Sequence, residues 1–150
     1  MLGTVGTLPA QVWRGQADSL LGLYKQTSNK KEQVDLLSRA SLIFLFQKPD
    51  TALQLSETAL QIAVTSGNDT ALATAHTSLS AVYLIKDNNP LTLKYALEAM
   101  KIAEKTPLPP DLMASIYRKM GYVYRNQDNN TASINAYKLA IDKRHYADEW

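Results

Sequence analysis

The chain has 150 residues, 45% of them hydrophobic, which suits one folded domain with a continuous core. It contains no cysteine, and this excludes disulfides, thiolate zinc sites and a cysteine nucleophile. Sixteen basic and fourteen acidic residues give a net charge of +2 at pH 7, without a long run of either sign. The charge pattern therefore gives no support for nucleic-acid binding.

The first eleven residues are apolar and uncharged, and Leu8-Pro9-Ala10 is similar to the end of a signal peptide cut after Ala10. Because the basic start of an export signal is missing, two interpretations stay open: a clipped export signal or a disordered leader. We assign residues 1–15 to this leader and residues 16–150 to one helical domain. The first interpretation predicts an extracytoplasmic (periplasmic) protein and the second a cytoplasmic one. No stretch approaches the roughly 20 apolar residues that span a bilayer, so no membrane segment is expected.

After the leader, apolar residues recur three and four positions apart, which is the spacing of one face of an α-helix. Short breaks rich in Asn, Asp, Gly and Pro separate these stretches. The predicted helices, in chain order, span residues 17–27, 31–46, 51–65, 70–86, 90–105, 110–126 and 131–144. Connections this short make neighbouring helices pack antiparallel.

Residues at the breaks have the chemistry of helix ends. Side chains at four predicted helix starts can accept a hydrogen bond from a free backbone N–H of the first turn. These four are Asp50, Asp69, Asn89 and Asn130. Pro90 and Pro110 suit the first helical turn, and Gly67 suits a left-handed residue just after a helix.

The breaks recur with a period of about 40 residues, and three segments align. The first helices align Ser41 with Ser80 and Gly121, and, three residues later, Phe44 with Tyr83 and Tyr124. The second helices align Ala52, Thr92 and Ser133, then Ser56, Ala96 and Tyr137, then Ala59, Ala99 and Ala140. We expect Ser41, Ser80 and Gly121 to face Ala59, Ala99 and Ala140 at a close helix contact, with the aromatic rings filling the space beside it.

This spacing of small and aromatic residues resembles the tetratricopeptide repeat. The match is closest in MGYVYRNQDNNTASINAYKLAID, good in LSAVYLIKDNNPLTLKYALEAMKIAEK and looser in FQKPDTALQLSETALQIA. The resemblance implies an all-α, right-handed superhelical solenoid of antiparallel helix pairs, with about three repeats after an N-terminal helix. The chain departs from the family in its period of 40 to 41 residues, in polar His76, and in Thr92 and Ser133 where the family prefers Ala.

A weaker resemblance concerns the opening segment. ADSLLGLYKQTSNKKEQVDLL before KPDTALQLSETALQIA is similar to the N-terminal sensory regions of Bacteroidetes-type membrane histidine kinases and LuxR-type regulators. It implies a sensing or partner-binding part of a bacterial signalling protein. The alternative hypothesis is a stand-alone structural or assembly scaffold that self-associates through its terminal repeats.

In the repeat family the first helices line a concave groove that binds a protein or peptide. The resemblance places Ser38, Leu42, Leu45, Thr77, Ala81, Leu84, Arg118, Tyr122 and Arg125 on that surface. An extended peptide with hydrophobic residues and a carboxylate near Arg118 and Arg125 would suit such a groove. The alternatives are that both arginines are solvated surface charges and that Leu42, Leu45 and Leu84 are buried against neighbouring helices.

Catalytic and cofactor chemistry has little support in the sequence. His76 and His145 are the only histidines, they belong to different repeats, and neither has a second His at helical spacing, so a metal site or a catalytic triad is not expected. His76 is predicted to be a packed or hydrogen-bonded core residue. No glycine-rich phosphate loop occurs. We therefore expect a binding protein that is not an enzyme and uses no cofactor.

Overall fold

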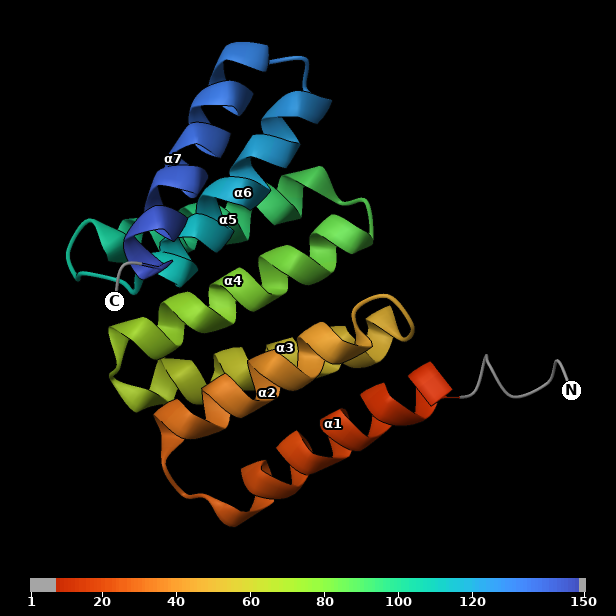
Figure 1. Ribbon diagram of the computed structural model, residues 1–150. Coiled ribbons are helices and arrows are strands. Elements are labelled where there is room, and N and C mark those ends of the chain that lie inside the picture. The colour runs from red at the N-terminus through yellow and green to blue at the C-terminus, as the bar shows by residue number, and fades with distance from the viewer. Residues whose placement is uncertain (1–7, 149–150) are drawn as a thin grey trace, which may run out of the picture.

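The computed structural model describes the backbone of residues 8–148 and the side chains of residues 11–144. Within this range the chain forms seven α-helices and no strand (Figure 1). The helices are α1 (Leu8–Gln26), α2 (Lys30–Phe44), α3 (Pro49–Ser66), α4 (Asp69–Ile85), α5 (Asn89–Ala103), α6 (Pro110–Asn126) and α7 (Asn130–Asp148).

Each helix packs against the next, and α2, α4 and α6 also pack against one another in that order. Figure 1 shows α1 to α5 stacked in sequence, with the α6–α7 hairpin inclined steeply to them. This arrangement confirms the predicted all-α solenoid of helix pairs, preceded by one N-terminal helix. It also places the first helix of every pair on a shared side of the molecule.

The first helix is longer than the sequence predicts, since α1 begins at Leu8 and the prediction began at residue 17. Residues 8–15 of the predicted leader are therefore helical, and residues 1–7 lie outside the described range. Pro9 is tolerated because it stands in the first turn, where no intrahelical N–H bond is lost. Ala17 is fully buried, and the Trp13 ring packs edge-on against Phe44 with centroids 5.5 Å apart.

The helix caps lie one residue earlier than predicted at three of the four starts. Asn68, Asn88 and Asn129 accept the bonds from the free N–H groups of α4, α5 and α7 at 2.9, 3.1 and 3.2 Å. At α3 the N-cap is Lys48, whose side chain makes no capping bond, and Asp50 instead pairs with Lys86 at 2.7 Å. The prediction was wrong by one residue because runs such as Asp-Asn-Asn-Pro hold several capping side chains in a row. Gly67 has the predicted left-handed backbone, with φ +63°.

One hydroxyl-to-carbonyl hydrogen bond recurs in the three helix pairs at the positions that the sequence aligned. Ser41 Oγ donates to the carbonyl of Ala52 at 2.9 Å, and Ser80 Oγ donates to the carbonyl of Thr92 at 2.8 Å. In the last pair the direction is reversed, because Gly121 has no hydroxyl and Ser133 Oγ donates to the Gly121 carbonyl at 2.9 Å. A side-chain oxygen reaches the opposite backbone only where the helices approach closely, so the aligned positions mark one equivalent crossing per pair.

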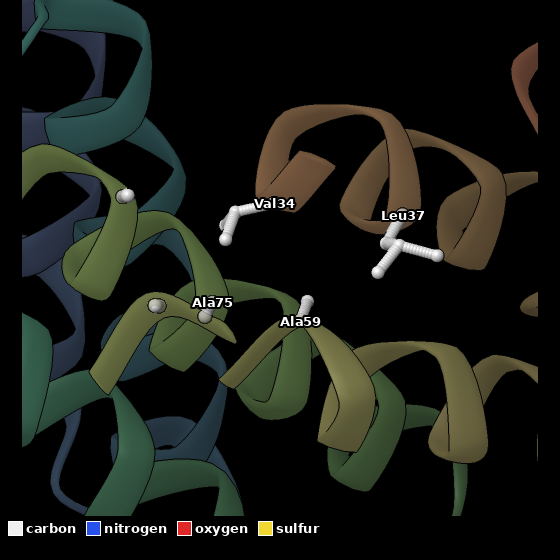
Figure 2. Close-up of a cluster of buried hydrophobic side chains, with 6 residues drawn as sticks. Val34, Leu37, Ala59 and Ala75 are labelled. Atoms are coloured by element: carbon white, nitrogen blue, oxygen red, sulfur yellow. The ribbon is translucent and has the colours of Figure 1, made fainter. Parts of the chain in front are cut away.

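The partners across this crossing differ from those predicted. Ser41 bonds to Ala52 and to Ser56, and Ala59 packs instead with Val34 and Leu37. In Figure 2, Val34 and Leu37 of α2 point toward Ala59 of α3 and Ala75 of α4. The closest approach of the paired helices therefore lies one to two helical turns nearer the loop that connects them than expected. In an antiparallel pair, the helix ends beside this loop lie opposite each other.

Side-chain size is matched across the crossing. Ser41 meets Ser56 with the two hydroxyl oxygens 2.7 Å apart. In the last pair the residue aligned with Ser56 is Tyr137, and a Cβ built on Gly121 would lie only 3.0 Å from its ring. Gly121 is thus the residue that leaves room for the tyrosine.

This matching predicts a coupling between the two positions. Gly121→Ser should reduce the free energy of unfolding by about 1–3 kcal/mol, because the added atoms overfill the contact with Tyr137. The same change in a Tyr137→Ser background, which restores the Ser41–Ser56 combination, should cost at least about 0.5 kcal/mol less. Urea denaturation of the four proteins in the double-mutant cycle measures the coupling, and strictly additive effects would contradict the contact.

Candidate functional site

A groove with a volume of about 770 Å³ lies between α2, α4 and α6. Its wall contains residues from equivalent positions of the three helices, with the same spacing that aligned the repeats. These rows are Lys31, Thr70 and Asp111, then Asp35, Thr74 and Ser115, then Arg39, Ser78 and Lys119. The groove is therefore a product of the repeat, and its volume is within the range of sites that hold drug-sized molecules or short segments.

Four of the nine residues predicted for the groove line it: Ser38, Leu42, Thr77 and Ala81. Ser38 and Thr77 are buried, whereas Leu42 is 52% exposed, so the prediction that Leu42 is buried against a neighbouring helix is wrong. These four residues come from α2 and α4 and belong to one continuous surface.

The other five predicted residues lie outside this groove. Leu45 is buried and packs with Ala52, Ala81 and Val82, as its alternative interpretation held, and Leu84 is half-buried. Arg118 is exposed, and the Arg125 guanidinium lies over the Tyr122 ring at 5.0 Å from its centre. On α6 the lining residues end at Lys119, so Tyr122 and Arg125 lie beyond the part of this helix that forms the groove.

Lys119 is the basic residue that α6 presents to the groove, in place of the predicted Arg118. One residue along a helix is a rotation of about 100°, which carries Arg118 to the exposed surface. Only 7% of the Lys119 surface is exposed, and its Nζ donates to Ser115 Oγ at 2.7 Å and to the Ser115 carbonyl at 3.4 Å. Burial, together with the neighbouring Arg118 charge, lowers the pKa of Lys119 to about 7. In the sequence, one pattern indicates this residue: Lys119 aligns with Arg39 and Ser78, which line the same groove.

Serine hydroxyls connect the groove to the interior. Ser78, which lines the groove, lies 2.7 Å from Ser56, and Ser56 lies 2.7 Å from Ser41. Ser38 also lines the groove and is only 5% exposed, and its hydroxyl has no hydrogen-bond partner. Buried polar atoms are seldom left unpartnered, so Ser38 stands out among the groove residues.

His76 lies apart from the groove, beside a smaller cavity of about 220 Å³ that Asp69 and Glu98 also line. It packs in a tilted stack on Tyr95 with ring centres 5.9 Å apart, in agreement with the predicted packed histidine. Its Nδ1 is buried without a partner, and burial lowers the pKa of His76. Among the described residues no group of three or more His, Cys, Asp or Glu side chains could hold a metal ion, and the His145 side chain lies outside the described range.

Comparison with known protein families, with characterised proteins and with solved structures gives no match. Among the described helices, none is both long enough and apolar enough to cross a bilayer. The groove and its side chains are therefore the features from which a function can be inferred.

Lys119→Met should remove a pH dependence of stability. Between the folded-state pKa of about 7 and the ordinary value of 10.5, the unfolded chain binds a proton that the folded chain does not. The free energy of unfolding should therefore rise with pH across this window, by up to about 1.4 kcal/mol per pH unit. Urea denaturation from about pH 6 to about pH 9 measures the slope above pH 7.

The variant Lys119→Met should show a flatter slope, and it should be more stable than the wild type near pH 6 because it buries no charge. Lys138→Met, at an exposed lysine on α7, is the control and should keep the wild-type slope. An unchanged slope in Lys119→Met would contradict the burial of the Lys119 amino group in the wild-type protein.

Proposed function

We propose that the protein is a peptide- or protein-binding module of the tetratricopeptide-like class, which holds an extended segment of its partner in the groove between α2, α4 and α6. The observation that supports this most directly is the origin of the groove wall. Equivalent turns of the first helices of three successive pairs supply its side chains, so polar side chains recur along its length. An extended chain repeats its own polar groups in the same way, which makes it a suitable occupant.

The composition of the wall supports a binding role. Thr74 and Ser115 supply hydroxyls at equivalent positions of α4 and α6, and Leu42 and Ala81 supply apolar surface. Asp35 and Arg39 form an ion pair at 3.5 Å with both side chains more than half exposed. Exposed pairs of this kind contribute little to stability, so both charges are free to exchange partners on binding.

We also propose a biological setting for the module, on the basis of the resemblance of residues 17–37 and the following turn to bacterial sensory regions. On this proposal the module is the sensing or partner-binding part of a signalling protein. The groove would be the input surface, and partner occupancy would be its signal.

Leu42→Glu tests the groove directly. Leu42 lines the groove and is 52% exposed, so a charge there should leave the fold intact while it places an unpaired carboxylate against the bound segment. Peptides selected by the wild-type protein should bind this variant at least about tenfold more weakly, as measured by fluorescence anisotropy.

The matched control is Val64→Glu, the same kind of change at a 67% exposed residue of α3 that does not line the groove. It should bind the selected peptides as the wild type does. Equal losses in both variants, or no loss in Leu42→Glu, would place the binding surface elsewhere.

A second function, a self-associating scaffold, is favoured by the exposed face of α7. Ile134 and Ile141 are 54% and 57% exposed, and they lie seven residues apart on one side of this last helix. Among the described helices, α7 packs only against α6. An exposed apolar helix face of this kind can mark a surface for protein association.

Ile134→Glu with Ile141→Glu separates the two functions. If the protein is a scaffold, light scattering should show a concentration-dependent oligomer for the wild type and a monomer for the variant, because the charges oppose burial of this face. A wild-type protein that stays monomeric at high concentration would rule out the scaffold and leave the peptide receptor.

A further inference from the structure

Two polar groups in the groove are buried without the partners that such groups normally have. The Lys119 amino group bonds only within its own helix, to Ser115, and no carboxylate of the described residues forms an ion pair with it. The Ser38 hydroxyl, on α2, has no hydrogen-bond partner among the residues that the structure describes. Leaving a buried ammonium unpaired is costly, and Lys119 lines the groove, where a ligand can reach it.

The direction of the serine hydrogen bonds shows what Ser78 can offer. A serine hydroxyl has one hydrogen to donate. Ser41 uses its hydrogen on the Ala52 carbonyl, so it accepts from Ser56, and Ser56 in turn accepts from Ser78. The Ser78 hydrogen is thus occupied, and toward the groove its oxygen acts as an acceptor.

Charged groups around Lys119 do not neutralise it. Those facing the groove are Lys31, Glu32, Asp35 and Arg39 from α2, none from α4, and Asp111 and Lys119 from α6. Asp35 is paired with Arg39, and Glu32 accepts a hydrogen bond from Thr27. The neighbouring charge that shifts the pKa of Lys119 is that of Arg118, which has the same sign.

We propose that the occupant of the groove is an extended peptide that places an Asp or Glu side chain on the Lys119 ammonium, while its main chain bonds to Ser38 and Ser78. This inference rests on the proposed peptide-binding function and names the chemistry of its ligand. A carboxylate supplies the counter-charge that the groove lacks, and its bond to the ammonium is charge-assisted. A peptide amide supplies an N–H for the Ser78 acceptor and a carbonyl for the Ser38 hydroxyl.

The size of the groove favours a peptide over a free anion. Its volume of about 770 Å³ extends over three helices, and a lone carboxylate or phosphate would fill a small part of it. The partnerless Ser38 hydroxyl comes from a different helix than Lys119, so one ligand that satisfies both must span the groove.

Binding of a carboxylate should also be coupled to proton uptake. The pKa of Lys119 is about 7 in the free protein, so its amino group is partly neutral near neutral pH. A bound carboxylate favours the charged form and raises that pKa. Affinity for an acidic peptide should therefore fall as the pH rises above about 7.

The first experiment is a selection with the whole chain against a phage library of random peptides fused at their C-termini, so that no peptide carries a free terminal carboxylate. Selected peptides should share an Asp or Glu at one position. Replacing that residue by Asn or Gln should weaken binding to the wild type about tenfold or more at pH 6.5.

The second experiment combines the peptide change with protein variants. In Lys119→Met the acidic and amide peptides should bind within about twofold of each other, and the fall of affinity between pH 6.5 and 8.5 should disappear. Arg118→Met, one residue away but outside the groove, is the matched control and should keep the preference for the acidic peptide. Lys119→Gln is a second variant in case Lys119→Met does not fold, and helical circular dichroism checks each protein.

The third variant, Ser38→Ala, should fold normally because the hydroxyl that it removes has no partner, and it should bind all selected peptides a few-fold more weakly.

Selected peptides that lack a shared acidic residue, or that bind Lys119→Met with an unchanged preference, would overturn the acidic-ligand inference and leave the proposed function standing. Binders found only on an array of peptides with free C-termini would also overturn it, in favour of a terminal carboxylate. Failure of both libraries to give any binder would overturn the proposed function itself.

Discussion

The close approach of two antiparallel helices at one small residue per pair is the constraint on which the rest of the structure depends. At Ser41 and Ser80 the helices come near enough for a hydroxyl to reach the opposite backbone carbonyl, and at Gly121 the opposite serine makes the same link in reverse. A larger side chain at any of these crossings would force the helices apart. The paired helices meet at equivalent positions, and the first helix of each pair packs against the first helix of the next, so α2, α4 and α6 lie together on one side.

The same constraint explains how the repeat tolerates sequence change. The last pair has Tyr137 where the first has Ser56, and Gly121 makes room for its ring. The large ring on one helix is thus accommodated by the absence of a side chain on the other. A repeat in which the residue at one position depends on the size of its partner across the crossing will look irregular in sequence and regular in structure.

The groove concentrates groups that the fold leaves incompletely satisfied. Away from the groove, Ser41 is bonded to Ser56, while His76 Nδ1 is a second buried atom without a partner among the described residues. In the groove, no described residue is a hydrogen-bond partner of the Ser38 hydroxyl or a counter-ion of Lys119. Such groups weaken the free protein, and their location on one surface is the reason to connect them with binding.

The site residues show how far helical spacing alone can be used. Of the residues that the family resemblance assigns to a binding surface, Ser38, Leu42, Thr77 and Ala81 line the groove between α2, α4 and α6. On α6, Lys119 stands in the groove wall and Arg118 does not. The α6–α7 hairpin is inclined to the helices before it (Figure 1), and the lining residues of α6 end at Lys119, so Arg118 and Tyr122, the equivalents of Ser38 and Leu42, lie outside the groove. A helical period gives the residues that share a stripe, but it does not give the direction of that stripe.

The helices, their order and the repeat that joins them could be predicted from the sequence, because these depend on local spacing and on residue size. Most helix boundaries were predicted within a few residues and the three crossings were aligned correctly, although α1 was begun too late and several caps were set one residue off. The folded structure was needed to show that Ser41 meets Ser56 rather than Ala59, that Lys119 is buried, and that Ser38 lacks a partner among the described residues. Those outcomes depend on how far apart the helices lie and how they are inclined, and both are set by the packing of residues that are distant along the chain.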